Sequence, residues 1–145
     1  MYNNANREFI SLVEEVDYIS QYFDLQRLRL NEYADVSFVH QVEDEAMPVP
    51  PMLLITFVEN AFKYGISSNE PCFIRIRLTQ QHNMLCFEVD NSVFGRDVKN
   101  SKRMGIENCR RHLSLLYPGC HTLDLGCNSG DNTFHVRLEL KNENV

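Results

Sequence analysis

The segment from Met52 to Tyr64 constrains the fold more than any other part of the sequence. As a helix it is apolar around most of its circumference, and its polar residues gather within about 100° at the helical spacing. They form one narrow polar stripe: Thr56, Glu59, Asn60 and Lys63. Because such a helix must be buried on most other sides, the rest of the chain must supply a layer for it to pack against.

The N-terminal part of the sequence predicts a long amphipathic helix over residues 6–30. Its apolar residues recur at steps of three and four: Phe9, Leu12, Val16, Ile19, Phe23 and Leu30. The Asn-rich start offers poor capping, so we expect the helix to continue from an upstream dimerisation segment. The stripe fits either the core of one subunit or a coiled-coil seam, and the pattern does not separate the two.

Alternating and β-branched residues predict strands in the remaining sequence. We expect strands at residues 36–42, 72–79, 84–91, 121–127 and 133–141. The segment from Gly105 to Tyr117 predicts a third helix, and the basic stretch 92–103 before it predicts an irregular loop. Three helices and about five strands with mostly antiparallel neighbours indicate the α+β class.

Length and composition exclude several classes of protein. The 145 residues suit one compact domain, and 14 Lys and Arg against 20 Asp and Glu give a net charge of −6. This charge disfavours general binding to nucleic acid. No apolar run approaches the roughly 20 residues that cross a bilayer. Five cysteines without a CxxC pair indicate reduced thiols of a cytosolic protein rather than zinc ligands.

Three local features could carry chemistry, but each also has a plain structural explanation. Glu59 and Lys63 fit an i,i+4 ion pair on a solvent-facing edge. Asp90 and Asn91 end an apolar strand, where such residues usually form a turn, although a carboxylate there can also accept a hydrogen bond from an exocyclic amine. Gly105 opens the third helix, at a helix N-terminus that favours phosphate.

Four segments in this order resemble a known family: YISQYFDLQRLRL (18–30), VPPMLLITFVENAFKYGI (49–66), FEVDNS (87–92) and RMGIENCRRHLSLLYPG (103–119). The chain is similar to the ATP-binding catalytic domain of LytS/YehU-type sensor histidine kinases, within the GHKL ATPase superfamily. The resemblance implies a Bergerat-type two-layer α/β sandwich, with helices on one face of a mixed, mostly antiparallel sheet. Residues 32–145 would form this domain, preceded by the amphipathic helix within residues 1–31.

The resemblance also implies roles for the polar stripe and the strand end. Asn60 matches the family's Mg²⁺ ligand, and Glu59 matches the residue that acts as general base or orients the attacking group. Lys63 matches a basic position near the ATP phosphates. Asp90, with Asn91 beside it, matches the aspartate that reads the adenine amine.

The segment before and within the third helix matches the family's ATP lid and second glycine-rich box. Residues 92–104 would form the lid. Gly105 matches a glycine of the box, and Ile106 and Asn108 lie in the helix that continues it.

Three residues depart from the family pattern. Tyr64 stands where many relatives have His, Ser92 replaces a flexible glycine, and Arg103 replaces the first glycine of the second box. Either the phosphates are held differently, with Tyr64 and Arg103 among the nucleotide contacts, or nucleotide affinity is low.

The expected function is that of a histidine protein kinase in the intact protein. This domain would use ATP and Mg²⁺ to phosphorylate a histidine on an upstream segment, from which a response regulator would receive the phosphoryl group. We expect a homodimer, with this domain on the cytoplasmic side of a membrane-anchored sensor. None of the five histidines has the sequence context of a phosphoacceptor, so the chain alone is expected not to phosphorylate itself.

Two other functions remain open at this point. The altered glycine boxes fit a degenerate nucleotide-binding domain that acts as a non-catalytic dimerisation or regulatory module. A serine kinase of the anti-sigma type shares the superfamily, but the leading helix argues against it.

Overall fold

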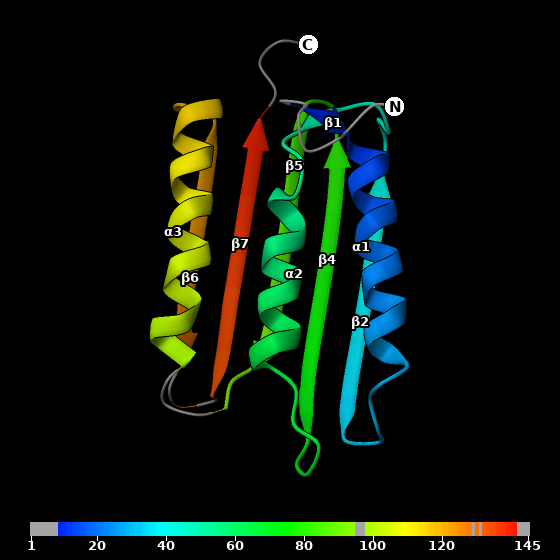
Figure 1. The fold of residues 1–145 in the computed structure, drawn as a ribbon. Helices are drawn as coiled ribbons and strands as arrows, with labels where there is room; N and C mark the ends of the chain where they lie inside the picture. The colour runs from blue at the N-terminus through cyan, green and yellow to red at the C-terminus, as the bar shows by residue number, and fades with distance from the viewer. Residues whose placement is uncertain (1–8, 95–97, 129, 131, 142–145) are drawn as a thin grey trace, which may run out of the picture.

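The computed structural model describes residues 9–94, 98–128, 130 and 132–141, with the side chains of residues 98–106 outside this description. The described residues form two layers, a sheet and a set of helices packed on it (Figure 1). This arrangement confirms the predicted two-layer α+β architecture. None of the helices in the described part of the chain combines the length and the apolar character that a membrane span requires.

The sheet has five strands in the order β2-β4-β5-β7-β6. Their bounds are β2 (Ala34–Val42), β4 (Cys72–Gln81), β5 (Met84–Ser92), β7 (Thr133–Lys141) and β6 (His121–Asn128). Strands β2 and β4 are parallel, and the other three neighbouring pairs are antiparallel. The sheet is therefore mixed and mostly antiparallel, as predicted. Two short strands, β1 (Ile10–Ser11) and β3 (Pro48–Val49), pair separately.

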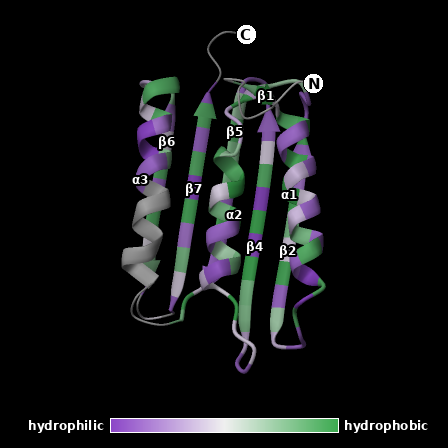
Figure 2. Cartoon of the chain, viewed as in Figure 1, coloured by the Kyte–Doolittle hydropathy of each residue, from purple (hydrophilic) through white to green (hydrophobic). Residues whose placement is uncertain are grey.

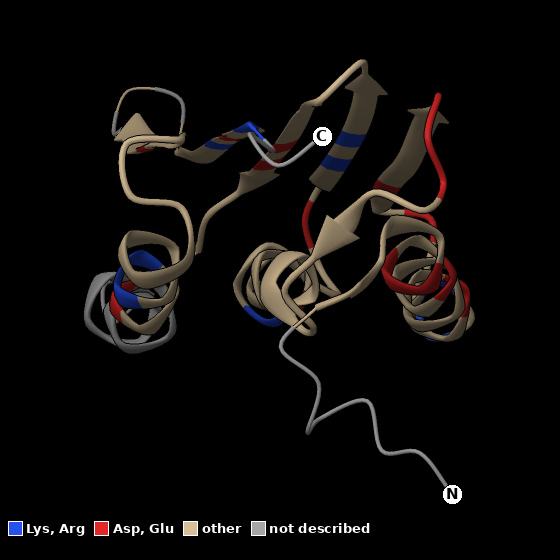
Figure 3. Ribbon diagram, turned by 90° about the horizontal axis from the view of Figure 1, so that it is seen from above, with Lys and Arg blue, Asp and Glu red and all other residues tan. Residues whose placement is uncertain are grey.

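The three helices are α1 (Leu12–Arg27), α2 (Leu53–Tyr64) and α3 (Val98–Leu116). Seen from above, all three lie on the same side of the sheet (Figure 3). Apolar and polar residues alternate along the strands, as the alternating colours of β4 and β7 in Figure 2 show. The apolar residues of β4, β5 and β7 are buried in one core with the inner sides of α1 and α2. The opposite face of the sheet carries the polar residues of these strands.

The helix α1 is shorter and better capped than the sequence analysis predicted. It begins at Leu12 rather than near residue 6, because Ile10 and Ser11 pair with β3. The backbone N–H of Glu14 donates to Ser11 Oγ at 3.4 Å, and Ser11 Oγ donates to the Glu14 carboxylate at 3.1 Å. A Ser followed three residues later by Glu is a helix-start pattern, so the expectation of a poorly capped start was wrong.

The helix α3 begins earlier than predicted. We expected an irregular loop over 92–103 and a helix from Gly105, but residues 98–104 are helical and Gly105 lies inside α3. The sequence VKNSKRM over 98–104 contains no Gly or Pro, so nothing in it opposes helix formation. Gly105 therefore does not form the N-terminus of a helix, and the predicted reason for phosphate binding at that position does not apply.

Candidate functional site

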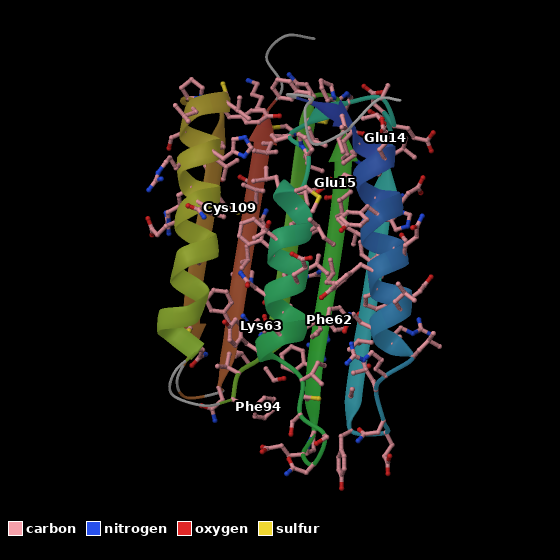
Figure 4. The ribbon with its side chains drawn as sticks, viewed as in Figure 1. Glu14, Glu15, Phe62, Lys63, Phe94 and Cys109 are labelled. Carbon is pink, nitrogen blue, oxygen red and sulfur yellow. The ribbon has the colours of Figure 1, made fainter. Side chains whose placement is uncertain are left out.

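The polar stripe of α2 lies where the sequence predicts it. Glu59 and Lys63 are exposed, Thr56 and Asn60 are partly exposed, and most of the other side chains of the helix are buried. Figure 4 shows Lys63 and its buried neighbour Phe62 near the C-terminal end of α2. No ion pair joins Glu59 to Lys63 among the described residues, so the stripe is not explained as an i,i+4 salt bridge.

Glu59 and Asn60 lie on different sides of α2, because successive residues of a helix are rotated by about 100° around its axis. Glu59 lies near Tyr22 of α1, and burial together with the Glu59 charge raises the pKa of Tyr22. Asn60 follows Thr56 by one turn, and Thr56 faces α3 across a cavity of about 330 Å³. Asn60 is therefore on the side of the helix that faces α3.

The carboxamide of Asn60 has an unusual environment. Its Nδ2 atom is buried and has no hydrogen-bond partner, the only such side-chain atom among the described residues. A buried polar group without a partner is costly and calls for an explanation, such as a ligand that completes its contacts. A hydrogen-bond acceptor on a ligand would satisfy this N–H group, so Asn60 is the candidate ligand position on α2.

Asp90 and Asn91 point to opposite faces of the sheet, as neighbours in a strand must. Asn91 is 1% exposed and lies beside Gly65, which ends α2. A Cβ atom added to Gly65 would lie 3.0 Å from the Cβ of Asn91, so only glycine allows this close approach. The side chain of Asn91 is thus on the same side of the sheet as the polar stripe.

Asp90 is on the open face, away from the helices. Its Oδ1 atom lies 2.6 Å from Nδ1 of His135, the residue opposite it in β7. The resemblance to sensor histidine kinases matches Asp90 to the group that reads an adenine amine beside the stripe. The structure does not bring Asp90 to the stripe, because the plane of the sheet separates them, and it brings Asn91 there instead.

Lys63 and Tyr64 end α2 next to Gly65. The Nζ atom of Lys63 lies 5.2 Å from the centroid of the Tyr64 ring, within the range of a cation–π contact. Tyr64 follows Asn60 by one turn, so it shares the side of the helix that faces α3. The C-terminal half of α2 therefore gathers a cation, an aromatic ring and two carboxamides, counting Asn91 from β5.

Comparisons with known proteins agree on one class of protein, although no family model matches the chain. Sensor histidine kinase YesM of Bacillus subtilis is 26% identical over 122 residues, which are 79% of this chain and 21% of YesM. Sensor histidine kinase BtsS of Escherichia coli K12 is 25% identical over 140 residues, 94% of this chain and 25% of BtsS. The chain thus spans about a fifth to a quarter of the length of these curated relatives.

The solved structures that superimpose on this chain are also histidine kinases. The catalytic domain of histidine kinase ThkA superimposes with a TM-score of 0.61 at 18% identity, covering 93% of this chain and 97% of that domain. ThkA in complex with the response regulator protein TrrA matches with a TM-score of 0.57 at 16% identity, covering 92% of this chain and 41% of the ThkA chain. The chain has the fold of a histidine kinase catalytic domain.

Ser92 is the residue of this kinase fold whose role the sequence analysis missed. It is 8% exposed, its Oγ donates to Gly65 O at 2.7 Å, and the Phe73 N–H donates to Oγ at 3.0 Å. Ser92 thus joins the end of β5 to the end of α2. Its position directly after Asn91, at the end of a strand whose alternate residues are apolar, is the signal that could have indicated this role.

The α3 residues matched to the kinase glycine box are only partly described. Arg103, Gly105 and Ile106 lie within α3, but their side chains are outside the described residues. Asn108 is exposed and lines the cavity that also contacts Thr56. The helix α3 therefore brings Asn108 to the side of α2 that carries Asn60.

Proposed function

We propose that the chain is the nucleotide-binding catalytic part of a sensor histidine kinase. In this proposal it binds ATP with Mg²⁺ along the C-terminal half of α2 and donates the γ-phosphoryl group to a histidine on another segment of the intact protein. A response regulator then receives the phosphoryl group. The intact protein is a homodimer anchored to a membrane, with this domain on the cytoplasmic side. The observation that carries the proposal is the grouping of Asn60, Lys63, Tyr64 and Asn91 around the end of α2.

The residues at this position fit a magnesium ion that comes with the nucleotide. Mg²⁺ prefers oxygen ligands and usually keeps phosphate oxygens and waters as most of its ligands, so one protein oxygen is enough. The carboxamide of Asn60 offers such an oxygen, and its buried amide nitrogen lacks a partner in the described residues. In this proposal Asn60 holds Mg²⁺, which neutralises charge on the phosphates.

Asn91 is the better candidate for recognition of the adenine base. Its Nδ2 atom donates to Ser92 O at 2.7 Å, and this contact leaves Oδ1 as the acceptor for an exocyclic amine. A carboxamide held in this orientation favours adenine over guanine, which has a carbonyl oxygen in place of that amine. Asp90 is not used, because it pairs with His135 on the opposite face.

The other residues serve the phosphates and the transfer step. Lys63 supplies positive charge, with Arg103, Gly105, Ile106 and Asn108 of α3 on the far side of the nucleotide, and Tyr64 packs beside Lys63. Phosphoryl transfer depends mainly on positioning and charge neutralisation. Glu59 remains the candidate general base or orienting group. Because Glu59 lies on the side of α2 that faces Tyr22 of α1, the accepting histidine would approach from that side.

Titration calorimetry with the non-hydrolysable analogue AMPPNP tests the site. We expect Mg²⁺-dependent binding to the wild type, loss of the Mg²⁺ dependence in Asn60→Ala, and at least about tenfold weaker binding in Asn91→Ala, equivalent to one buried hydrogen bond. Asp90→Ala is the matched control, since it changes the neighbouring residue on the opposite face. Weaker binding in Asp90→Ala than in Asn91→Ala would contradict the assignment. Absence of binding at millimolar AMPPNP would favour the degenerate regulatory module.

A transfer assay tests the reaction. With radiolabelled ATP the chain alone is expected to remain unlabelled. A histidine-bearing helical segment of the longer protein, added separately, is expected to become labelled, and Lys63→Ala and Glu59→Gln should slow this labelling. Labelling of the chain itself would show that one of its own histidines accepts the phosphoryl group.

A further inference from the structure

Glu15 of α1 is the only charged side chain that is fully buried among the described residues, at 1% exposure. Both of its carboxylate oxygens accept hydrogen bonds from α2. The Met52 N–H donates to Oε1 at 3.2 Å, and the N–H groups of Leu54 and Ile55 donate to Oε2 at 3.1 and 3.3 Å. Figure 4 shows Glu15 at the end of α1 that lies beside the start of α2. A buried carboxylate is tolerated only with such partners.

The start of α2 has no other cap. Its N-cap residue, Met52, has a positive φ of 67° and makes no side-chain capping hydrogen bond, and the first turn contains no acidic residue. The first N–H groups of any helix lack partners within the helix and need an acceptor from elsewhere. Glu15 supplies that acceptor, so the cap of α2 belongs to a different helix.

Other contacts hold the two helices as one unit. At the start of α1, the Leu12 N–H donates at 2.8 Å to the carbonyl oxygen of Met47, in the segment that leads to α2. At the other end, the ring of Phe62 lies 5.8 Å from that of Tyr22 and 5.7 Å from that of Phe23. Because α2 is tied to α1 at both ends, α1 helps to set its position on the sheet, together with the hydrogen bond from Ser92 of β5 to Gly65 at the end of α2.

The proposed site is divided between α2, which carries Asn60 and Lys63, and the sheet, which carries Asn91. Asn60 lies six residues after Leu54, about 9 Å along the helix axis, and Lys63 follows one turn later. Asn91 belongs to β5. A shift of α2 would therefore move the residues proposed to bind Mg²⁺ and phosphate, Asn60 and Lys63, relative to Asn91, which is proposed to recognise the adenine base.

We propose that Glu15 is a positioning residue of the nucleotide site: by capping α2 from α1, it sets the position of Asn60 and Lys63 relative to Asn91. This inference rests on the proposed function, because it assigns those three residues to one ligand. It makes α1 the element through which a movement elsewhere in a longer protein would change nucleotide affinity.

The test compares Glu15→Gln with Glu14→Gln in the full chain. Both changes remove one carboxylate from the first turns of α1, but the Glu14 carboxylate accepts a hydrogen bond from Ser11 Oγ at the start of α1, whereas the Glu15 carboxylate accepts from α2. The binding of Mg²⁺·AMPPNP and of adenosine is measured well below the melting temperature of each variant. We expect Glu15→Gln to weaken Mg²⁺·AMPPNP binding about tenfold and adenosine binding much less, since Asn91 stays in place. Glu14→Gln should bind both ligands as the wild type does.

Two results would overturn the inference. One is a Glu15→Gln variant that melts earlier but binds Mg²⁺·AMPPNP as the wild type does, which indicates a purely structural cap. The other is an equal loss for both ligands, which indicates general damage to the site. Failure of the wild type to bind either ligand would instead reject the proposed function.

In that last case amide hydrogen exchange still tests the role of Glu15. Glu15→Gln, but not Glu14→Gln, should accelerate exchange along α2 as far as Asn60 and Lys63. Acceleration confined to residues 52–55 would overturn the inference, because Glu15 would then order only the first turn of the helix.

Discussion

At the scale of single residues, Ser92 shows how one side chain can join two elements of the site. Replacing it by Ala removes the acceptor of the Phe73 N–H and the donor to Gly65 O, both in a buried position. We expect Ser92→Ala to lower the free energy of unfolding by about 1 to 3 kcal/mol. Urea denaturation measures this, with Ser37→Ala on the exposed side of β2 as control. Equal free energies of unfolding for the two variants would mean that the hydrogen bonds of Ser92 do not stabilise the fold.

Cysteine reactivity is a second prediction at the residue scale. Burial raises the pKa of Cys109 to about 11, whereas Cys127 is exposed. At pH 8 only about one in a thousand Cys109 thiols would be ionised, and only the thiolate reacts. Iodoacetamide should therefore modify Cys127 in the folded chain and Cys109 only in denaturant, as mass spectrometry of the peptides can determine. Modification of Cys109 at the rate of Cys127 would contradict its burial between α2 and α3.

At the scale of elements, the contact of α1 with α2 should make stability depend on pH. Burial raises the pKa of Glu15, and the three backbone hydrogen bonds lower it by less. A raised pKa means that the folded state binds the proton more tightly than the unfolded state, so stability falls as pH rises from the unfolded value through the folded one. The stability of the wild type relative to Glu15→Gln should therefore decrease over this range. Chemical denaturation at several pH values measures it, and an increase would show that the hydrogen bonds outweigh burial.

At the scale of the whole molecule, a ligand that binds only the folded chain must stabilise it. At a concentration of 100 times Kd, Mg²⁺·AMPPNP would add about 2.7 kcal/mol, which raises Tm by roughly 8 °C for a domain of this size. Asn60→Ala should lose the part of this rise that depends on Mg²⁺, and Asp90→Ala should keep all of it. A rise that is the same with and without Mg²⁺ would leave Asn60 without its proposed role.

Much of the fold could be predicted from local patterns, and so could the face of the sheet on which each residue of the strand end lies. The stripe of α2 and the hairpin of β4 and β5 follow from periods of 3.6 and 2 residues. The period of 2 also places Asn91 on the face of Leu85, Phe87 and Val89 and Asp90 on the other face, as the structure has them. The resemblance assigns the adenine contact to Asp90, whereas alternation along the strand places Asn91 on the face that meets α2.

The sequence by itself determined which residues are apolar on one side of each element, because this depends only on neighbours along the chain. Only the tertiary structure decided the partners that are distant in sequence. Glu15 meets the start of α2 some 37 to 40 residues later, and Asp90 meets His135 across 45 residues. No local period encodes such contacts, since they depend on how the elements pack. In the sequence, Glu15 stands out only as a charged residue between the apolar residues Leu12, Val16 and Ile19.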